Sequence, residues 1–281
     1  MTSTLDSARS SRAFPSFPRV REGSMGWGLR VVLTLVGLLL VAPTAVVIPM
    51  SFSSGLSFEF PPKHWSLRWY QEFFHSQAWT AALLNSLQIA LIVAVLATLM
   101  GVGAAYVFDR VRFSGRGAAR SLIMAPMITP GIVVAVAVYA TFLRWHLNGT
   151  LLGFVIAHTV LALPFVITSV STALAGYDRR LEAAAASLGA TPLSAFLRVT
   201  IPLVAPGVAS GFVFAFVTSL DEVVVALFLQ TPDIRTLPVQ MYESVTLEVD
   251  PTIAAASSMI VVFTTAVLLL PQFLRQKRSA P

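Results

Sequence analysis

The sequence contains no cysteine among its 281 residues. This absence excludes disulfide frameworks, thiolate metal sites and cysteine nucleophiles. Charge is also scarce, because charged residues make up 11% of the chain, whereas soluble domains carry about 25%. Apolar residues make up 56% of it. This balance is typical of a chain that crosses a membrane several times and forms one bundle of helices.

Lysine is nearly absent as well, since Lys63 and Lys277 are the only two and neither follows a glycine. A phosphate-binding P-loop requires Gly-Lys-Ser/Thr, so the chain has no ATP site of that kind. We therefore expect no enzymatic activity and no bound cofactor in this chain. Its energy must come from a partner or from an ion gradient.

The histidines show no ligand spacing with acids, which argues against a metal site. They are His64, His75, His146 and His158. No serine–histidine–acid set can be assigned from the sequence. We expect His158, alone in an apolar run, to be a hydrogen-bonded packing residue, with a proton relay as the alternative.

Six long uncharged runs dominate the chain, and a bilayer core of about 30 Å requires about 20 apolar helical residues. The runs are Val31–Met50, Ala78–Phe108, Ser121–Leu143, Leu147–Tyr177, Val199–Leu220 and Pro251–Leu274. They predict an all-α membrane protein with six transmembrane helices. The first is too long for a signal peptide's apolar region and is interpreted as an uncleaved signal anchor. Pro126 and Pro130 predict a kink in the third.

The basic residues predict the orientation, because lysine and arginine accumulate on the cytoplasmic side. With the N-terminus inside, fifteen of the nineteen fall in cytoplasmic segments. The four outside are Lys63, Arg68, Arg144 and Arg235. Both termini are therefore predicted to be cytoplasmic, and the net charge of +6 reflects topology rather than nucleic-acid binding.

The cytoplasmic stretch between the fourth and fifth runs is too long for a plain loop. Its alanine-rich part, Leu181–Leu188, is strongly helix-forming, with Asp178 as N-cap and Gly189 as the helix-ending residue. A second short helix is expected from Thr191-Pro192 to Ile201-Pro202. Its apolar face would consist of Leu193, Phe196 and Leu197. The two short helices would meet at an elbow. This elbow is either a docking ridge for another protein or an interfacial hairpin that anchors the bundle.

The segment "EAAAASLGATPLSAFLRVTIPL" resembles the signature of permease subunits in binding-protein-dependent ABC importers. That signature runs Glu-Ala-Ala, three residues, Gly, nine residues, Ile, one residue, Leu-Pro. Aligned on Gly189 and Pro202, its glutamate position is Ala183, and the nearest acid is Glu182, one residue earlier. In that family the segment is the coupling helix that fits a cleft on the ATPase. The resemblance implies ATPase-coupling roles for Glu182, Ala183, Ala184, Gly189, Ala190, Phe196 and Pro202.

The resemblance extends along the chain through "WSLRWYQEFF", "APMITPGIVVAVAV" and "SLDEVVVALFLQTP", which look like the spermidine/putrescine branch. It implies the type I ABC importer permease fold, with the coupling helix between spans four and five. It also implies a homologous second permease, two ATPase subunits that hydrolyse ATP with Mg, and a periplasmic solute-binding protein. The location implied is the bacterial inner membrane, with transport by alternating access. Branches for GABA-like, opine or other amino compounds share much of the pattern.

This resemblance gives the chain a domain division. The expected segments are a cytoplasmic N-terminal segment (1–28), the signal anchor (29–50), a periplasmic loop (51–78), the permease core (79–275) with its coupling segment (178–206), and a cytoplasmic tail (276–281).

Two adjacent acids, Asp221 and Glu222, lie where the fifth run would otherwise continue through Leu229. We expect the fifth helix to start near Pro206-Gly207 and to carry both acids in the outer half of the core. An ionised acid in the bilayer centre costs about 2.5–3.5 kcal/mol, and no basic residue in the runs neutralises these two. On a helix they would point about 100° apart. Asp221 is therefore the candidate cation site, and Glu222 a structural or gating residue.

Tyr139 and Trp145 complete the candidate solute pathway, since aromatic faces bind ammonium groups. Packing is the alternative role for both. Two rival functions remain open at this point. One is a proton- or sodium-coupled carrier that uses Asp221 as a relay, and the other is a membrane scaffold without transport.

Overall fold

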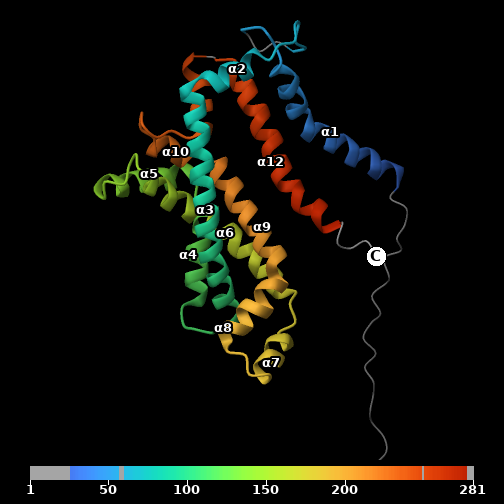
Figure 1. The fold of residues 1–281 in the computed structure, drawn as a ribbon, viewed down its shortest axis with the longest axis vertical. Coiled ribbons are helices and arrows are strands. Elements are labelled where there is room, and N and C mark those ends of the chain that lie inside the picture. Colours follow the sequence, from blue (N-terminus) through green and yellow to red (C-terminus); the bar gives the residue numbers. More distant parts are fainter. Residues whose placement is uncertain (1–25, 57–59, 249, 277–281) are drawn as a thin grey trace, which may run out of the picture. The chain divides into compact units, whose positions relative to one another are not determined.

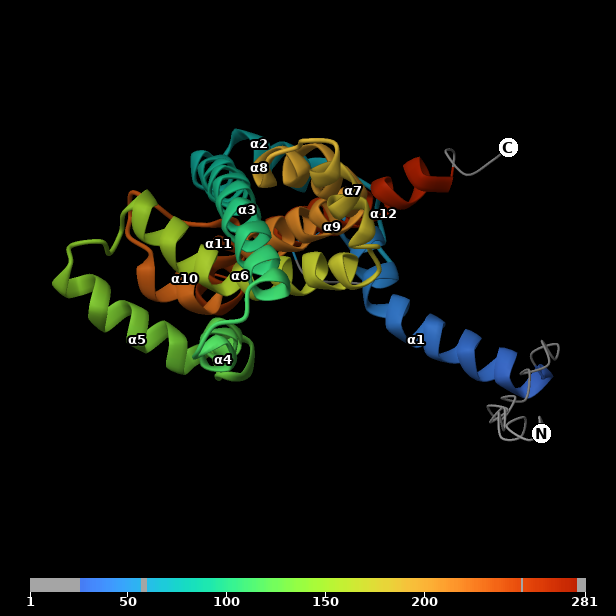
Figure 2. The same ribbon diagram turned by 90° about the horizontal axis from the view of Figure 1, so that it is seen from below.

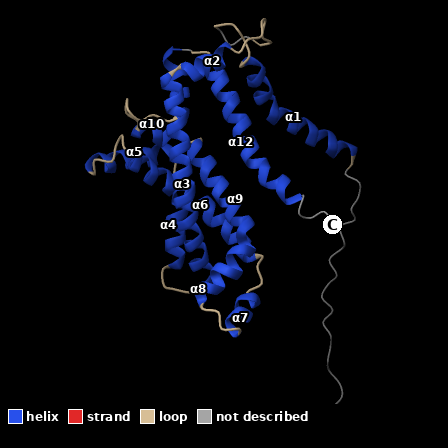
Figure 3. Cartoon of the chain, in the orientation of Figure 1, coloured by secondary structure: helices blue, strands red, loops and turns tan. Residues whose placement is uncertain are grey.

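The structure is a computed structural model that describes residues 26–56, 60–248 and 250–276. The chain divides into two compact units, residues 1–45 and 46–281. Every regular element in the described ranges is a helix, and none of them is a strand (Figure 3). The prediction of an all-α chain is thus confirmed there. Most of the expected N-terminal segment, and the tail from residue 277, lie outside the described residues.

Helix α1 (Trp27–Met50) makes up nearly all of the described part of the first unit. Its last five residues, from position 46 on, are assigned to the second unit. Arg30 is its only charged residue, and its mean hydropathy is 2.7. Its 24 residues give about 36 Å of helix at 1.5 Å per residue, which is enough to cross a bilayer core. It matches the predicted first span, beginning four residues earlier.

Four stretches of the second unit are also long and apolar enough to span a membrane. They contain helices α3 (Gln77–Arg110), α6 (Leu151–Ala175), α9 (Ile201–Leu220) and α12 (Thr252–Gln276). With α1 they make five candidate spans among the described residues, and a bent pair of helices makes a sixth if it is one span. The prediction of six spans agrees with this count once the bent pair is included.

The third predicted span is this bent pair, α4 (Arg116–Ile128) and α5 (Gly131–Arg144), whose axes turn by 107°. The expectation of one kinked helix is corrected to two helices with a sharp break. Thr129 and Pro130 are both extended, with ψ of 133° and 131°. Proline disfavours the helical region for the residue before it and offers no N–H to continue the ladder, so α4 stops at Ile128.

Helices α3, α6 and α9 pack against one another and form the core of the second unit (Figures 1 and 2). Small residues allow this close approach. A Cβ atom on Gly101 would come within 2.6 Å of Val166 Cγ1, and one on Gly207 within 2.5 Å of Ala173 Cβ. Both glycines, from α3 and α9, therefore let their helices approach α6 more closely than any larger residue permits.

The two ends of the bundle carry different short helices. Helix α2 (Arg68–His75) packs near the start of α3, with α11 (Leu237–Glu243) and a π-helical turn (Ser244–Glu248) at the same end. There Phe73, Trp79 and Leu237 form a small apolar cluster, and Trp79 Nε1 donates to Asp250 Oδ2 at 3.2 Å. Helices α7 (Arg180–Ser187) and α8 (Pro192–Ala195) lie at the opposite end (Figure 1).

The predicted end of the second short helix at Ile201-Pro202 is wrong. From α8 the chain passes through a π-helical turn, Phe196–Thr200, directly into α9. The Ile201 N–H bonds to the Phe196 carbonyl, five residues back. Pro202 has no N–H and its ring would crowd a tight turn, so a wider π turn before it lets the helix continue. The expected start of the fifth helix at Pro206-Gly207 is also wrong, because Pro206 lies inside α9.

Candidate functional site

The elbow, defined as α7, α8 and the turn between them, forms by local signals in the sequence. The Asp178 carboxylate accepts the Arg180 N–H at 2.9 Å, so it caps α7 from one residue before the N-cap position. Gly189 has φ of +89°, the left-handed conformation that ends a helix. Thr191 Oγ1 accepts the Ser194 N–H at 3.3 Å and caps α8. The predicted elbow is confirmed.

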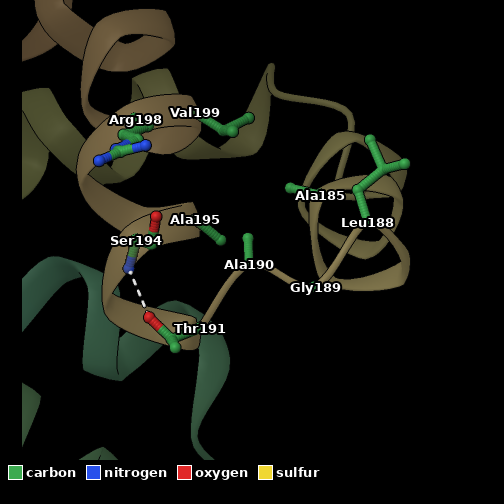
Figure 4. Close-up of a pocket in the computed structure, with 9 residues that line it drawn as sticks. All are labelled: Ala185, Leu188, Gly189, Ala190, Thr191, Ser194, Ala195, Arg198 and Val199. Carbon is green, nitrogen blue, oxygen red and sulfur yellow. Dashed lines mark hydrogen bonds between the residues drawn. The ribbon is translucent and has the colours of Figure 1, made fainter.

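An open groove of about 580 Å³ separates α7 from α8 (Figure 4). Its lining residues are Ala185, Leu188, Gly189, Ala190, Thr191, Ser194, Ala195, Arg198 and Val199. Beside it Leu188 is 90% exposed and Leu193 67% exposed. Large apolar side chains so open to the surroundings suit either a docking ridge for another protein or an anchor at the membrane interface.

Phe196 does not belong to this exposed ridge. Its ring packs 4.6 Å from that of Tyr106 on α3, whereas Leu193 and Leu197 remain exposed. The expectation of one face containing all three is therefore corrected, since Phe196, where the π-helical turn begins, packs against the bundle. Pro202 lies in the first turn of α9, outside the lining of the groove.

Glu182 and the two alanines after it face different ways. Ala183 and Ala184 are exposed. The Glu182 carboxylate instead accepts a hydrogen bond from Arg110 Nη2 at 2.8 Å, and its side chain is only 17% exposed. Thr200 Oγ1 donates to the same carboxylate oxygen. The acid is thus engaged within this chain.

The two adjacent acids occupy a break in the fifth span. Helix α9 ends at Leu220, and a separate short helix, α10 (Val224–Leu229), begins three residues after Asp221. The expectation of a continuous helix here is wrong, so the 100° helical separation expected of the two side chains does not apply. The Glu222 carboxylate accepts the N–H groups of Val225 at 2.9 Å and Ala226 at 2.8 Å. A carboxylate at a helix N-terminus satisfies amides that lack helical partners.

A buried histidine adjoins this break. His158 of α6 is fully buried, its Nδ1 lies 2.9 Å from Ser219 Oγ, and its Nε2 lies 3.6 Å from Glu222 Oε2. The carboxylate can only accept, so we assign the proton to Nε2 and let Nδ1 accept from the Ser219 hydroxyl. The expected hydrogen-bonded packing role of His158 is confirmed.

Ser219, His158 and Glu222 thus lie together, a grouping that the sequence did not reveal, but His158 Nε2 makes no hydrogen bond to the carboxylate. Ser219 and His158 are 61 positions apart and meet only because α6 packs on α9. Ser219 is 5% exposed, so the set is enclosed and its hydroxyl is directed to the ring. The contact between His158 and Ser219 therefore joins α6 to the end of α9, where the break begins. No group of three or more possible metal ligands occurs among the described residues.

The surroundings of the Asp221 carboxylate differ from those of the Glu222 carboxylate. It is exposed, and no hydrogen bond or ion pair holds its carboxylate within the described ranges. Glu222 has a side chain only 12% exposed and two backbone donors. Asp221 is thus the acid left available for a ligand.

Tyr139 lies on α5, which packs against α10, and Trp145 is the residue directly after that helix. The Tyr139 ring meets Phe228 of α10 edge-on at 6.0 Å and is 36% exposed. Trp145 stacks on Phe142 at 6.2 Å and is 64% exposed. No ring contact or hydrogen bond in the described structure joins either residue to Asp221, so a shared site for all three stays a prediction.

A helical bundle with several apolar spans, a broken span that carries acids and an exposed elbow at one end is the architecture of a membrane transport subunit. A family model for the "Binding-protein-dependent transport system inner membrane component" matches residues 97–279. The chain belongs to this family.

Curated relatives extend the similarity over most of the chain. The spermidine/putrescine transport system permease protein PotC of Haemophilus influenzae is 32% identical over 246 residues, which cover 85% of this chain and 93% of the relative. The putrescine transport system permease protein PotI of Escherichia coli is 34% identical over 239 residues, 82% of this chain and 85% of the relative.

Solved structures support the fold. A bacterial ABC transporter involved in the import of the acidic polysaccharide alginate matches with a TM-score of 0.67 at 18% identity, over 89% of this chain and 95% of its own. An amino acid ABC transporter solved with histidines matches with a TM-score of 0.56 at 18% identity, over 74% of this chain and 98% of its own. These likenesses confirm the all-α permease fold.

Proposed function

We propose that the chain is the permease subunit of an ATP-driven importer for a small cationic amine of the polyamine class. The relatives named for spermidine and putrescine transport carry this proposal, since each matches more than four fifths of the chain. Polyamines are linear cations with several ammonium groups. A pathway for them needs carboxylates that no residue of the protein already neutralises.

Asp221 is the carboxylate that fits this role. Helix α9 has 20 residues and therefore extends about 30 Å from the elbow end to Asp221. The acid thus lies far along the span, at an opening in the helical ladder. Its exposure and its lack of a described partner leave both oxygens available to an ammonium group. Tyr139 and Trp145 are further candidates through their aromatic faces.

The elbow supplies the contact with the motor. An apolar ridge of Leu188, Leu193 and Leu197 beside an open groove suits the cleft of an ATPase subunit. Gly189 and Ala190 leave the groove open because neither has a large side chain to fill it. ATP and Mg then bind to the partner ATPase subunits, and this chain itself holds no cofactor and catalyses no reaction.

The assembly that follows from these contacts contains this chain, a homologous second permease, two ATPase subunits and a periplasmic solute-binding protein. The elbow lies on the cytoplasmic side in this proposal, and both termini are cytoplasmic, in agreement with the distribution of basic residues. ATP-driven closure of the ATPase pair moves the elbow, and the bundle opens outward to receive the solute.

Uptake of radiolabelled putrescine by the assembled complex tests this proposal. We expect ATP-dependent uptake that an Asp221→Asn variant reduces at least fivefold more for putrescine than for monovalent butylamine. Asp233→Asn is the matched control, since Asp233 is an exposed acid in the loop after α10. Equal losses for both amines would remove Asp221 from selectivity. Uptake that survives deletion of the ATPase and collapses with an uncoupler would instead identify a secondary carrier.

A further inference from the structure

Helix α7 is attached to the bundle in an unusual way. None of its residues is fully buried, so apolar packing contributes little to holding it in place. Two ion pairs connect this helix and its N-cap to α3: Glu182 with Arg110, and Arg179 with Asp109. Arg179 is 62% exposed, and exposed pairs contribute little. The attachment of α7 therefore depends mainly on Glu182.

The Glu182 clamp, defined as Glu182, Arg110 and Thr200, joins three elements through one carboxylate oxygen. Arg110 Nη2 donates to Oε1 from the end of α3, and Thr200 Oγ1 donates to the same oxygen from the last residue before α9. Thr200 is fully buried, and the Arg110 side chain is 15% exposed. Ionic hydrogen bonds shielded from water in this way are stronger than surface pairs.

The surroundings of Arg110 fix its position. Its guanidinium carbon lies 5.6 Å from the ring centre of Tyr106 and 5.7 Å from that of Tyr177, two residues after the end of α6. Asp109 adds a second carboxylate at 3.4 Å. Contacts on several sides thus hold the guanidinium of Arg110. A displacement of Glu182 is therefore passed through Arg110 to α3 and does not only rotate the Arg110 side chain.

The two helices that meet at the clamp extend to the transport pathway. Helix α3 has 34 residues without a proline, about 51 Å of uninterrupted helix packed on α6 and α9. Helix α9 leads from Thr200 to the break at Asp221. Neither Glu182 nor Arg110 lines the groove between α7 and α8. The clamp is therefore separate from the docking surface and lies between it and the pathway.

We propose that Glu182 is a positioning residue that transmits movement of the docked elbow to α3 and α9, acting within this chain and not on the ATPase. The inference rests on the proposed function, because it assigns the step between ATPase docking and opening of the pathway. It also gives a role to Glu182, which stands one position before Ala183, where the family signature has its glutamate. Ala183 and Ala184 are themselves exposed.

Hydrogen exchange of the purified complex tests the clamp without any solute. Glu182→Ala removes both contacts, and the high helix propensity of alanine offsets the loss of an acid from the first turn of α7. We expect amides of residues 180–187 to exchange at least tenfold faster than in the wild type, and Arg179→Ala to change them less than twofold. Unchanged exchange in Glu182→Ala would overturn the clamp, whatever the solute proves to be.

Transport by the same variants gives a second readout. We expect Glu182→Ala to keep the ATPase subunits on co-purification but to lose at least tenfold in putrescine taken up per ATP hydrolysed. The charge swap Arg110→Glu with Glu182→Arg should recover part of that ratio, which separates the ion pair from a general folding defect. Loss of the ATPase subunits in Glu182→Ala would overturn the inference, since Glu182 would then belong to the docking surface. Absence of ATP-dependent uptake in the wild type would refute the proposed function, and the exchange result would still decide the clamp.

Discussion

Replacing Glu222 by glutamine should lower the stability of the protein, whereas replacing Asp221 by asparagine should lower uptake and leave the stability unchanged. Glu222→Gln keeps the shape of the side chain but leaves one oxygen to meet two backbone N–H groups, now 2.9 and 2.8 Å from the carboxylate. The new amide N–H₂ faces one of these donors. Val225 and Ala226 are 1% and 0% exposed, so water cannot replace the missing acceptor. The variant should therefore lose stability.

The size of the loss follows from the contacts. A hydrogen bond to a charged group contributes about 1.5–3 kcal/mol, and a buried donor left unpaired costs about 1–3 kcal/mol. We expect Glu222→Gln to lower the free energy of unfolding by about 2–4 kcal/mol. At about 2–4 °C per kcal/mol for a domain of this size, the apparent Tm falls by roughly 5–15 °C. Asp221→Asn, at an exposed position without a partner, should stay within about 0.5 kcal/mol.

Thermal unfolding of the purified complex in lipid nanodiscs measures the first effect, and putrescine uptake measures the second. Asp221→Asn should retain the wild-type Tm and lose uptake, whereas Glu222→Gln should show the lower Tm. Equal Tm shifts in the two variants would refute the division of roles between the acids. So would a stable Glu222→Gln variant, because the cap on α10 would then be dispensable.

Two further predictions concern glycines. Gly207→Ala should destabilise the bundle by about 1–3 kcal/mol, because the new Cβ would lie 2.5 Å from Ala173 Cβ and 3.0 Å from the Ser169 carbonyl oxygen. Gly103→Ala is the matched control, with no atom within 4 Å of the new Cβ, and a Tm at or above the wild type is expected; similar Tm values in both would contradict the close packing of α6 and α9. Gly189→Asp should abolish uptake while leaving the amount of protein in the membrane fraction unchanged, because φ of +89° disfavours any residue with a Cβ and the new carboxylate would lie in the groove proposed to receive the ATPase. Normal uptake and ATPase co-purification in that variant would remove Gly189 from the docking surface.

The elbow could be predicted from the sequence because its determinants are local. Gly189 adopts the left-handed conformation that glycine tolerates, and Thr191 caps a helix whose first residue is Pro192. Each signal acts within four residues, so no knowledge of tertiary packing is needed. The long apolar runs were predictable for the same reason, since length and hydropathy alone decide whether a helix can cross a bilayer.

The boundaries of the fifth span were not predictable by the same rules. Pro202 and Pro206 each suggested a helix end, yet a π-helical turn accommodates the first and the second lies within α9. The break at Asp221 contains neither proline nor glycine. In retrospect its signal is Glu222, an acid placed to cap the N–H groups of Val225 and Ala226. Only the structure reveals that a new helix begins there.

The surroundings of Glu182 and Glu222 depend on residues far away along the chain. Glu182 meets Arg110 from 72 positions away, and His158 reaches the break from another helix. Spacing rules cannot supply such pairs. A histidine inside an apolar span does, however, require a polar partner, and that requirement was the one available clue to the His158–Ser219 contact.

The break at the end of α9 explains how one span carries two acids without a basic residue. Glu222 accepts hydrogen bonds from the N-terminal amides of α10, so it does not need a ligand as its partner. Asp221 has no such stabilisation in the described structure, and an ionised acid in contact with lipid costs about 2.5–3.5 kcal/mol at mid-bilayer. We therefore expect an exposed, ionised Asp221 to face water or a cation. Both are available in the proposed solute pathway, where we predict that Asp221 lies.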